Sequence, residues 1–232
     1  MKSARSVRIF TGISIATLAI SAISALAFGT VSASITKIDA FAGIDKRPDK
    51  KSSAINYLLV GSDTREGLTK AELKELRVGS VATAAGKRSD TMLLVHISKA
   101  RDKAVLVSIP RDTFALIPAH LNKAGKTIPA VHSKINSAFN WGGAPLLIQT
   151  IEEMTQLKID HYVEVNFAGF ASVIDSLGGI EVCTKKDIDD PKSHLVLPAG
   201  VHTLNGIEAL KYVRTREFDG MGDIGRMQRQ QA

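Results

Sequence analysis

Residues 88–112 read RSDTMLLVHISKARDKAVLVSIPRD. Two apolar runs of strand length, Thr91–Ile97 and Lys103–Pro110, stand on either side of a mostly polar connector of five residues. A connector this short joins antiparallel neighbours, so the pattern predicts a β-hairpin. A third run of the same kind lies upstream in AINYLLVGSDTRE, residues 54–66, where Gly61 ends the apolar stretch. We therefore expect three strands in an antiparallel meander.

The ends of these three strands carry charged residues. In a meander, the end of the first strand, the start of the second and the end of the third share one edge of the sheet. Those places hold Gly61-Ser62-Asp63, Arg88-Ser89-Asp90 and Pro110-Arg111-Asp112, so one edge would collect three carboxylates and two arginines. Each cluster alone is also typical of an ordinary strand end or turn. Their convergence is what indicates a site.

The rest of the chain alternates helical and strand-like segments. Helices are expected at 69–77, 145–157, 168–179 and 206–214, strands at 161–167 and 180–183, and a loop at 186–194. This order predicts an α/β domain, with an α+β-type mixed sheet covered by helices.

Local signals mark where these helices begin and end. Pro145 stands in the first turn of its helix, and Gly178-Gly179 stops the next one. Asn205 and Glu208 form a capping box at the start of the last helix. The helix at 145–157 is expected to place three apolar side chains on its buried face, those of Leu147, Ile151 and Met154.

The N-terminus predicts a membrane anchor. Lys2, Arg5 and Arg8 precede the uncharged stretch Ile9–Thr36, whose 28 residues form a helix of about 40 Å against a hydrocarbon core of about 30 Å. The positive charges before it place the N-terminus in the cytoplasm and the rest of the chain outside. The alternative is a signal peptide cleaved near Ala25-Leu26-Ala27. Both interpretations export the remaining chain.

The expected layout follows from this stretch. It comprises a cytoplasmic tail (1–8), a single transmembrane anchor (9–36), a polar juxtamembrane linker (37–53) and a domain outside the cell membrane (54–232). A cytoplasmic enzyme and a DNA-binding regulator are both disfavoured, and nucleic acid is not an expected partner.

The net charge is +7, and part of the excess is concentrated near the end of the chain. Arginine, whose planar fork binds phosphate in a bidentate way, predominates there over lysine; a solvated charged face is the alternative. Arg214 and Arg216 share a face only if the backbone is extended, so we predict that the last helix ends near Arg214. The cluster consists of Lys211, Arg214, Arg216, Arg226 and Arg229.

Several other sites are excluded or unsupported. The single cysteine, Cys183, rules out a disulfide within the chain, and we expect it to be an inert core residue. His96 lies within a strand pattern and is expected to be structural. Residues 122–127 end like a phosphate-binding loop, but His120 stands where that loop requires glycine. Serine-hydrolase and zinc-peptidase motifs do not occur in the sequence.

Acidic and arginine side chains in an exported domain fit phosphate chemistry. Carboxylates suit Mg²⁺, which usually binds substrate phosphates as well. Arginines neutralise the phosphate oxygens on which charge develops during phosphoryl transfer. Because no ready supply of ATP exists outside the membrane, a lipid-linked pyrophosphate is the expected donor.

At these positions the sequence resembles the LytR–CpsA–Psr cell-envelope proteins. The similarity runs in family order from Asn56 to Gln231, in NYLLVGSDTRE, KRSDTMLLVHI, VLVSIPRDTF, HSKINSAFNWGG, DHYVEVNFAGFASVIDSLGGIEV, LNGIEALKYVRTRE and GDIGRMQRQQ. The resemblance implies a phosphotransferase that moves an anionic glycopolymer, such as teichoic acid, capsule or arabinogalactan, from a polyprenyl-pyrophosphate carrier onto peptidoglycan. It also implies an apolar channel for the lipid tail between sheet and helices.

The resemblance also implies roles for individual residues. Asp63 and Asp90 correspond to ligands of Mg²⁺, or of Mn²⁺ in its place, and Asp223 to a catalytic residue. Arg88 and Arg111 correspond to residues that are both catalytic and pyrophosphate-binding. The remaining residues implied in pyrophosphate binding are Arg214, Arg216 and Arg226, with Lys134 and Gln230 as weaker correspondences.

Two features depart from the family pattern. Asp63 and Asp90 are 27 residues apart, a longer separation than in the shorter members and similar to actinobacterial ones. The sequence stops at Ala232, where family domains continue with further helix and strand, so we expect a fragment or a truncated product.

Three other functions use the same features. A polyprenyl-pyrophosphate hydrolase would need the same residues but no acceptor. A non-catalytic protein that binds wall polymer or lipid would need only the arginines. A membrane-bound transcriptional attenuator would need its globular part in the cytoplasm, against the charge bias at residues 2–36.

Overall fold

The structure is a computed structural model that describes residues 36–76, 78, 89–122, 124–215, 225 and 230, with only the backbone of Asp90. The chain divides into two compact units, residues 1–39 and 40–232, and every strand and helix among the described residues belongs to the second. Apart from Thr36, the expected anchor at 9–36 lies outside the described residues. Within the described part of the chain, no helix has both the length and the apolar character needed to cross a membrane.

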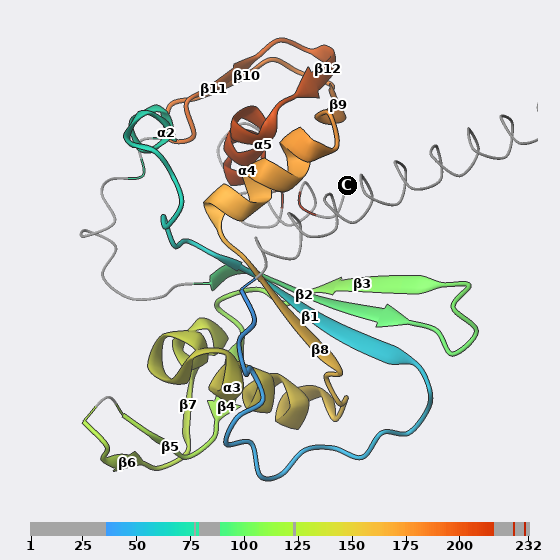
Figure 1. Cartoon of the computed structure of the whole chain (residues 1–232), viewed down its shortest axis with the longest axis vertical. Helices are drawn as coiled ribbons and strands as arrows, with labels where there is room; N and C mark the ends of the chain where they lie inside the picture. Colours follow the sequence, from blue (N-terminus) through green and yellow to red (C-terminus); the bar gives the residue numbers. More distant parts are fainter. Residues whose placement is uncertain are drawn as a thin grey trace, which may run out of the picture. The chain divides into compact units, whose positions relative to one another are not determined.

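A four-stranded mixed sheet forms the centre of the second unit, in the order β3-β2-β1-β8 (Figure 1). Strands β1 (Ile55–Ser62), β2 (Ser89–Ile97) and β3 (Ala104–Ser108) are antiparallel neighbours, which confirms the predicted meander. Strand β8 (His161–Val165) pairs with β1 in parallel. The mixed sheet expected from the sequence is therefore present.

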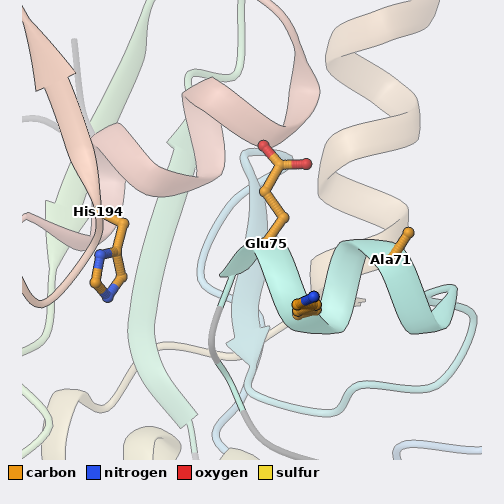
Figure 2. A pocket seen from close by; sticks show the side chains of 4 residues that line it. Ala71, Glu75 and His194 are labelled. Carbon is orange, nitrogen blue, oxygen red and sulfur yellow. The ribbon is translucent and has the colours of Figure 1, made fainter.

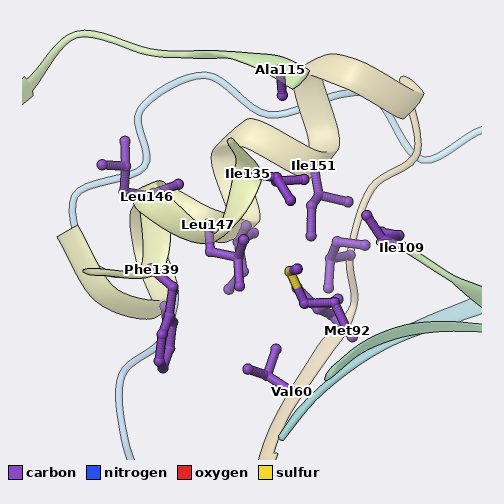
Figure 3. Packing of buried hydrophobic residues seen from close by; sticks show 14 of the residues in the cluster. Val60, Met92, Ile109, Ala115, Ile135, Phe139, Leu146, Leu147 and Ile151 are labelled. Atoms are coloured by element: carbon purple, nitrogen blue, oxygen red, sulfur yellow. The ribbon is translucent and has the colours of Figure 1, made fainter. Parts of the chain in front are cut away.

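Helix α3 (Ile135–Thr155) covers one face of this sheet. Burial alternates along β1, so Leu58 and Val60 point into the core while Leu59 between them does not. In Figure 3, side chains from the sheet and from α3 point toward one another. Each fully buried side chain of this size contributes roughly 1.5–3 kcal/mol to stability. The centre of this core contains Leu58, Val60, Met92, Leu94, Ile135, Phe139, Leu147 and Ile151.

Helix α3 is longer than predicted and is interrupted once. It begins at Ile135 rather than at Pro145, and Gly143 (φ 66°, ψ −153°) breaks its regular backbone. Pro145 therefore stands at the start of the second segment, where its missing N–H costs no helical hydrogen bond. Leu147 and Ile151 are fully buried as predicted, but Met154 is 42% exposed in the last turn. The prediction for Met154 was wrong because the buried face ends one turn earlier.

The other elements form two smaller groups. Between β3 and α3 lie β4 (Phe114–Ile117), β5 (His120–Leu121), β6 (Thr127–Ile128) and β7 (Val131–Lys134), in the pairs β4–β7 and β5–β6. The second group contains α2 (Lys70–Leu76), α4 (Phe167–Ser176), β9 (Ile180–Thr184), β10 (Ile188–Asp190), β11 (Leu195–Leu197), β12 (Gly200–Leu204) and α5 (Gly206–Arg214).

The predicted start and end of α5 and the glycine stop after α4 are confirmed. Asn205 accepts a hydrogen bond from the Glu208 N–H at 2.9 Å, and the Glu208 carboxylate accepts one from the Asn205 N–H at 3.0 Å, so α5 begins with a capping box. Helix α5 ends at Arg214, and Thr215 after it is extended (φ −59°, ψ 142°). Gly178 and Gly179, which follow α4, have positive φ angles of 83° and 98°.

Two expectations for the second group were wrong. The predicted loop at 186–194 contains β10, whose Ile188 is 1% exposed and packs in a core with α4 and α5. Cys183 is exposed rather than buried, because Val182 and Thr184 on either side of it point inward in β9. His96, in contrast, has the expected structural contact, since its Nδ1 lies 2.7 Å from Asn56 Oδ1.

Residues 40–50, expected to belong to the linker, contact the domain. Ala40 is 3% exposed, and Phe41 and Ile44 pack against the core beneath α3. Arg47 forms an ion pair with Glu152 of α3 (Nη2–Oε1, 2.7 Å), and its guanidinium lies 4.4 Å from the centre of the Phe41 ring. Glu152 is 1% exposed. A buried carboxylate therefore holds this segment in place.

We expect Arg47→Met to destabilise the chain strongly. The substitution leaves the Glu152 carboxylate buried without its cation, which costs about 3 kcal/mol. The matched control is Lys50→Met, because Lys50 pairs with Asp160 at a more exposed position (2.6 Å, Lys50 side chain 41% exposed); it should cost under about 1 kcal/mol. Urea unfolding of the full chain measures both. Equal losses would contradict a special role for the Arg47–Glu152 pair.

Candidate functional site

A cavity of about 690 Å³ opens where β1 and β8 end and α4 and α5 begin to cover the sheet. Its floor is formed by residues of the sheet, among them Leu59, Leu93 and Val165. Its walls are apolar side chains from the helices and from β9, namely Phe167, Phe170, Ile174, Ile180, Leu210 and Val213. Its polar lining residues include Asp63, Arg65, Asn166, Lys192, Ser193, Arg214 and Gln230. The cavity is thus apolar in its body, with charged groups of both signs in its lining.

The pairing of β1 and β2 changes register at this cavity. Gly61 pairs with Thr91 and Ser62 pairs with Ser89, so Asp90 is the extra residue of a β-bulge. Bulges are frequent next to active sites because they redirect a side chain. Asp63 follows Ser62 directly. The backbones of Asp63, just after β1, and Asp90, near the start of β2, therefore lie at the same end of two neighbouring strands, as the meander predicts.

Arg214 is oriented by its neighbours in the cavity wall. Its guanidinium donates a hydrogen bond from Nη1 to the carbonyl of Leu76 at the end of α2, at 3.4 Å. It also lies 5.4 Å from the centre of the Phe167 ring, the first residue of α4. Since α5 ends at this residue, the side chain is held at a helix terminus and next to the cavity.

The sequence-predicted site residues are only partly brought together. Asp63, Arg214 and Gln230 line the cavity. Arg111 follows β3 at the same end of the sheet but is outside the lining. Lys134 is also outside it, and its Nζ lies 3.1 Å from Asp112 Oδ1 on an exposed surface. Outside the described residues are Arg88, Arg216, Asp223 and Arg226, together with the side chain of Asp90.

Four polar lining residues were not singled out from the sequence, namely Arg65, Asn166, Lys192 and Ser193. Arg65 lies two residues after Asp63 in the GSDTRE stretch, so its position next to the acidic strand end was a usable signal. Lys192 and Ser193 belong to the turn between β10 and β11, which read as a loop. Only the packing of that turn against the rest of the fold brings them to the cavity.

A second hollow, of about 420 Å³, lies between α2 and the same turn (Figure 2). Figure 2 shows His194 on one side and Ala71 and Glu75 on the other. The Glu75 carboxylate accepts a hydrogen bond from Lys211 Nζ at 2.7 Å. Among the described residues, Glu75 is the one acidic residue that lines this hollow, and it is already ion-paired. The hollow is therefore a weaker candidate for the functional site than the larger cavity.

Comparison with known proteins gives the family. Residues 26–232 match the model of the LytR_cpsA_psr family. The chain belongs to the LytR–CpsA–Psr family. This finding confirms the resemblance described above, and the structure shares the mixed α/β fold of solved family members.

Three relatives illustrate the similarity. The chain is 38% identical over 180 residues to the probable cell wall biosynthesis protein LcpB of Corynebacterium glutamicum, covering 77% of this chain and 40% of that protein. It is 36% identical over 191 residues to the polyisoprenyl-teichoic acid–peptidoglycan teichoic acid transferase TagT of Bacillus subtilis, covering 80% of this chain and 52% of TagT. A TagT structure with bound octaprenyl pyrophosphate lipid matches with a TM-score of 0.57 at 30% identity, over 85% of this chain and 64% of that one. The chain thus spans about half the length of the curated relatives it matches.

The walls of the cavity depend on a close contact between α4 and α5. Gly206, the first residue of α5, lies against Ala171 of α4, and a Cβ on Gly206 would stand 2.3 Å from the Ala171 carbonyl oxygen. The Gly206 N–H donates to Asp175 Oδ1 at 2.7 Å. Only glycine permits this approach of the two helices.

We expect Gly206→Ala to destabilise the family domain despite alanine's better helix propensity. Propensity favours alanine by about 1 kcal/mol, but overpacking against backbone costs about 3 kcal/mol or more. Gly169→Ala in α4 is the control, because the atom nearest its Cβ is the side-chain oxygen of the N-cap residue Asn166, at 3.0 Å, and loss of that cap costs only about 1 kcal/mol. Thermal unfolding should show a large loss for Gly206→Ala alone. A stabilised Gly206→Ala chain would refute this packing.

Proposed function

We propose that this chain is a Mg²⁺-dependent phosphotransferase of the cell envelope, which moves an anionic glycopolymer from a polyprenyl-pyrophosphate carrier onto peptidoglycan. The observation that carries the proposal is the cavity, with its apolar floor and walls and its charged lining residues. A polyprenyl pyrophosphate has the same division, an apolar tail joined to an anionic head. The name of TagT and the lipid bound in its structure support this assignment.

The size and lining of the cavity suit the lipid end of such a carrier. A volume of about 690 Å³ is within the range of roughly 300–1,000 Å³ typical of small-molecule sites. Aromatic and aliphatic side chains, such as Phe170 and Ile174, would contact the prenyl units. Arg65 and Arg214 would contact the phosphates, where guanidinium groups bind in a bidentate way.

The acidic strand ends are the proposed metal site. Carboxylate oxygens are ligands that Mg²⁺ prefers, and Mn²⁺ accepts the same set. The proposed ligands are the carboxylates of Asp63 and Asp90, which the sequence places at the ends of two neighbouring strands. Two carboxylates fit Mg²⁺, which commonly keeps positions for phosphate and water. When bound, the ion would neutralise phosphate charge.

The chain's own residues would then act on the head of the carrier. Arg214, held by Leu76 and Phe167, would position a phosphate and stabilise the charge that develops on its oxygens. Attack by an acceptor hydroxyl on the polymer-bearing phosphorus breaks the pyrophosphate bond, joins the polymer to the acceptor through phosphate and releases polyprenyl monophosphate. On the family resemblance, the proposal also assigns pyrophosphate binding to four further arginines and a catalytic role to Asp223. The arginines are Arg88, Arg111, Arg216 and Arg226, and the first two are also proposed to be catalytic.

The proposed location is the outer side of the cell membrane. The charge pattern around residues 9–36 favours a single-pass anchor with a cytoplasmic N-terminus. Such an anchor would keep the domain beside the bilayer that carries the lipid-linked donor. The candidate polymers are teichoic acid, capsule and arabinogalactan.

Asp63→Asn and Asp90→Asn are each expected to lower the Mg²⁺-dependent turnover of a polyprenyl-pyrophosphate substrate by about a hundredfold or more. Neither change should unfold the chain. Asparagine keeps the size and the acceptor oxygen of the side chain, so both variants should remain folded in metal-free buffer. Mg²⁺ at a hundred times its Kd should stabilise only the wild type, by about 2.7 kcal/mol.

The control for these variants is Asp49→Asn, at an exposed position away from the cavity. It should keep both turnover and the Mg²⁺-dependent rise in melting temperature. If each aspartate instead only caps its own strand, either change would cost about 1 kcal/mol and leave the metal response unaltered. That result would contradict the shared metal site.

A further inference from the structure

The turn at residues 191–194, between β10 and β11, contributes Lys192 and Ser193 to the cavity lining. Its two strands are anchored in the core formed with α4 and α5, where Ile188 and Leu195 are at most 4% exposed. The turn therefore has a fixed position relative to the cavity. The family resemblance assigns it no role.

Asp190 sets the shape of this turn. Its Oδ1 accepts hydrogen bonds from the N–H of Lys192 at 2.8 Å and of Ser193 at 3.3 Å. Its carbonyl oxygen accepts one from the N–H of His194 at 2.8 Å, and His194 has a φ of 55°. Asp190 itself is 1% exposed. A side chain that bonds successive backbone N–H groups in this way holds a turn in one conformation.

The Ser193 hydroxyl is the unusual group in this turn. Ser193 is 1% exposed, and in the part of the chain that the structure describes its Oγ has no hydrogen-bond partner. A buried hydroxyl without a partner is unfavourable. Because Ser193 lines the cavity, a ligand in the cavity can supply the missing acceptor.

We propose that the β10–β11 turn is an additional binding element for the pyrophosphate head of the carrier. Ser193 Oγ–H donates a hydrogen bond to a phosphate oxygen, and Lys192 beside it contributes positive charge. The ligand's identity rests on the proposed function. Phosphate is favoured over a sugar because the rest of the described lining has two arginines, Arg65 and Arg214, against one carboxylate, Asp63. Phosphate oxygens also accept hydrogen bonds without needing a partner for a proton of their own.

The test is binding of octaprenyl pyrophosphate to the full chain by isothermal titration calorimetry. Ser193→Ala should raise Kd about tenfold or more, since a hydrogen bond to a charged group is lost. Without ligand, its melting temperature should be unchanged or higher, because the buried hydroxyl is gone. Ser193→Thr keeps the hydroxyl and should largely restore binding. Ser172→Ala, at an exposed position on α4, should match the wild type.

A second pair of probes separates the head of the ligand from its tail. Ser193→Ala should weaken binding of inorganic pyrophosphate and leave the Kd for octaprenol, which has no phosphate, unchanged. If Ser193→Ala weakens octaprenol binding equally, or leaves the Kd for octaprenyl pyrophosphate unchanged, the proposed role of Ser193 is overturned but the proposed function is not. A wild-type chain that binds no octaprenyl pyrophosphate would overturn the proposed function as well.

Discussion

Strand β1 pairs on both sides, antiparallel with β2 and parallel with β8, and this double pairing determines where the ends of the strands lie. Gly61 is opposite Thr91 on one side and Val165 on the other. Asp63 and Asn166, which follow β1 and β8, and Asp90, the bulge residue near the start of β2, therefore lie at one edge of the sheet. A slip of one residue in β1 would turn Leu58 and Val60 away from α3, so burial of the core also fixes the position of the candidate site.

The two faces of the sheet have separate roles. Leu58 and Val60 pack under α3, whereas Leu59, between them, points to the opposite face and lines the cavity. Leu93, the partner of Leu59 in β2, does the same. One face thus provides stability and the other provides an apolar floor. Helices α4 and α5, which meet at Gly206 and Ala171, cover only the end of that second face.

Much of this arrangement could be predicted from the sequence because its determinants are local. Apolar runs separated by a short connector predicted the meander, and Asn205 with Glu208 predicted the start of α5. The end of α5 at Arg214 followed from the need for extended backbone beyond it. In each case the deciding residues lie within a few positions of one another.

The remaining features depend on contacts between distant segments. Arg47 and Glu152 are 105 residues apart, so nothing near Arg47 indicated that its segment packs on the domain. Cys183 lies in a strand too short for its alternation to show which face is buried, and it was wrongly expected in the core. From the sequence, the turn with Lys192 and Ser193 was predicted only as part of a loop. Its position in the cavity lining depends on other elements that are distant in the sequence.

The proposed phosphotransferase function depends on the cavity receiving both the lipid tail and the pyrophosphate head of one carrier. The most direct test incubates the full chain and Mg²⁺ with a labelled glycopolymer on polyprenyl pyrophosphate and with peptidoglycan, and then identifies the products by mass spectrometry. Transfer predicts labelled polymer joined to peptidoglycan through phosphate, together with polyprenyl monophosphate. Release of free polymer phosphate with no label on peptidoglycan, or no reaction at all, would contradict it.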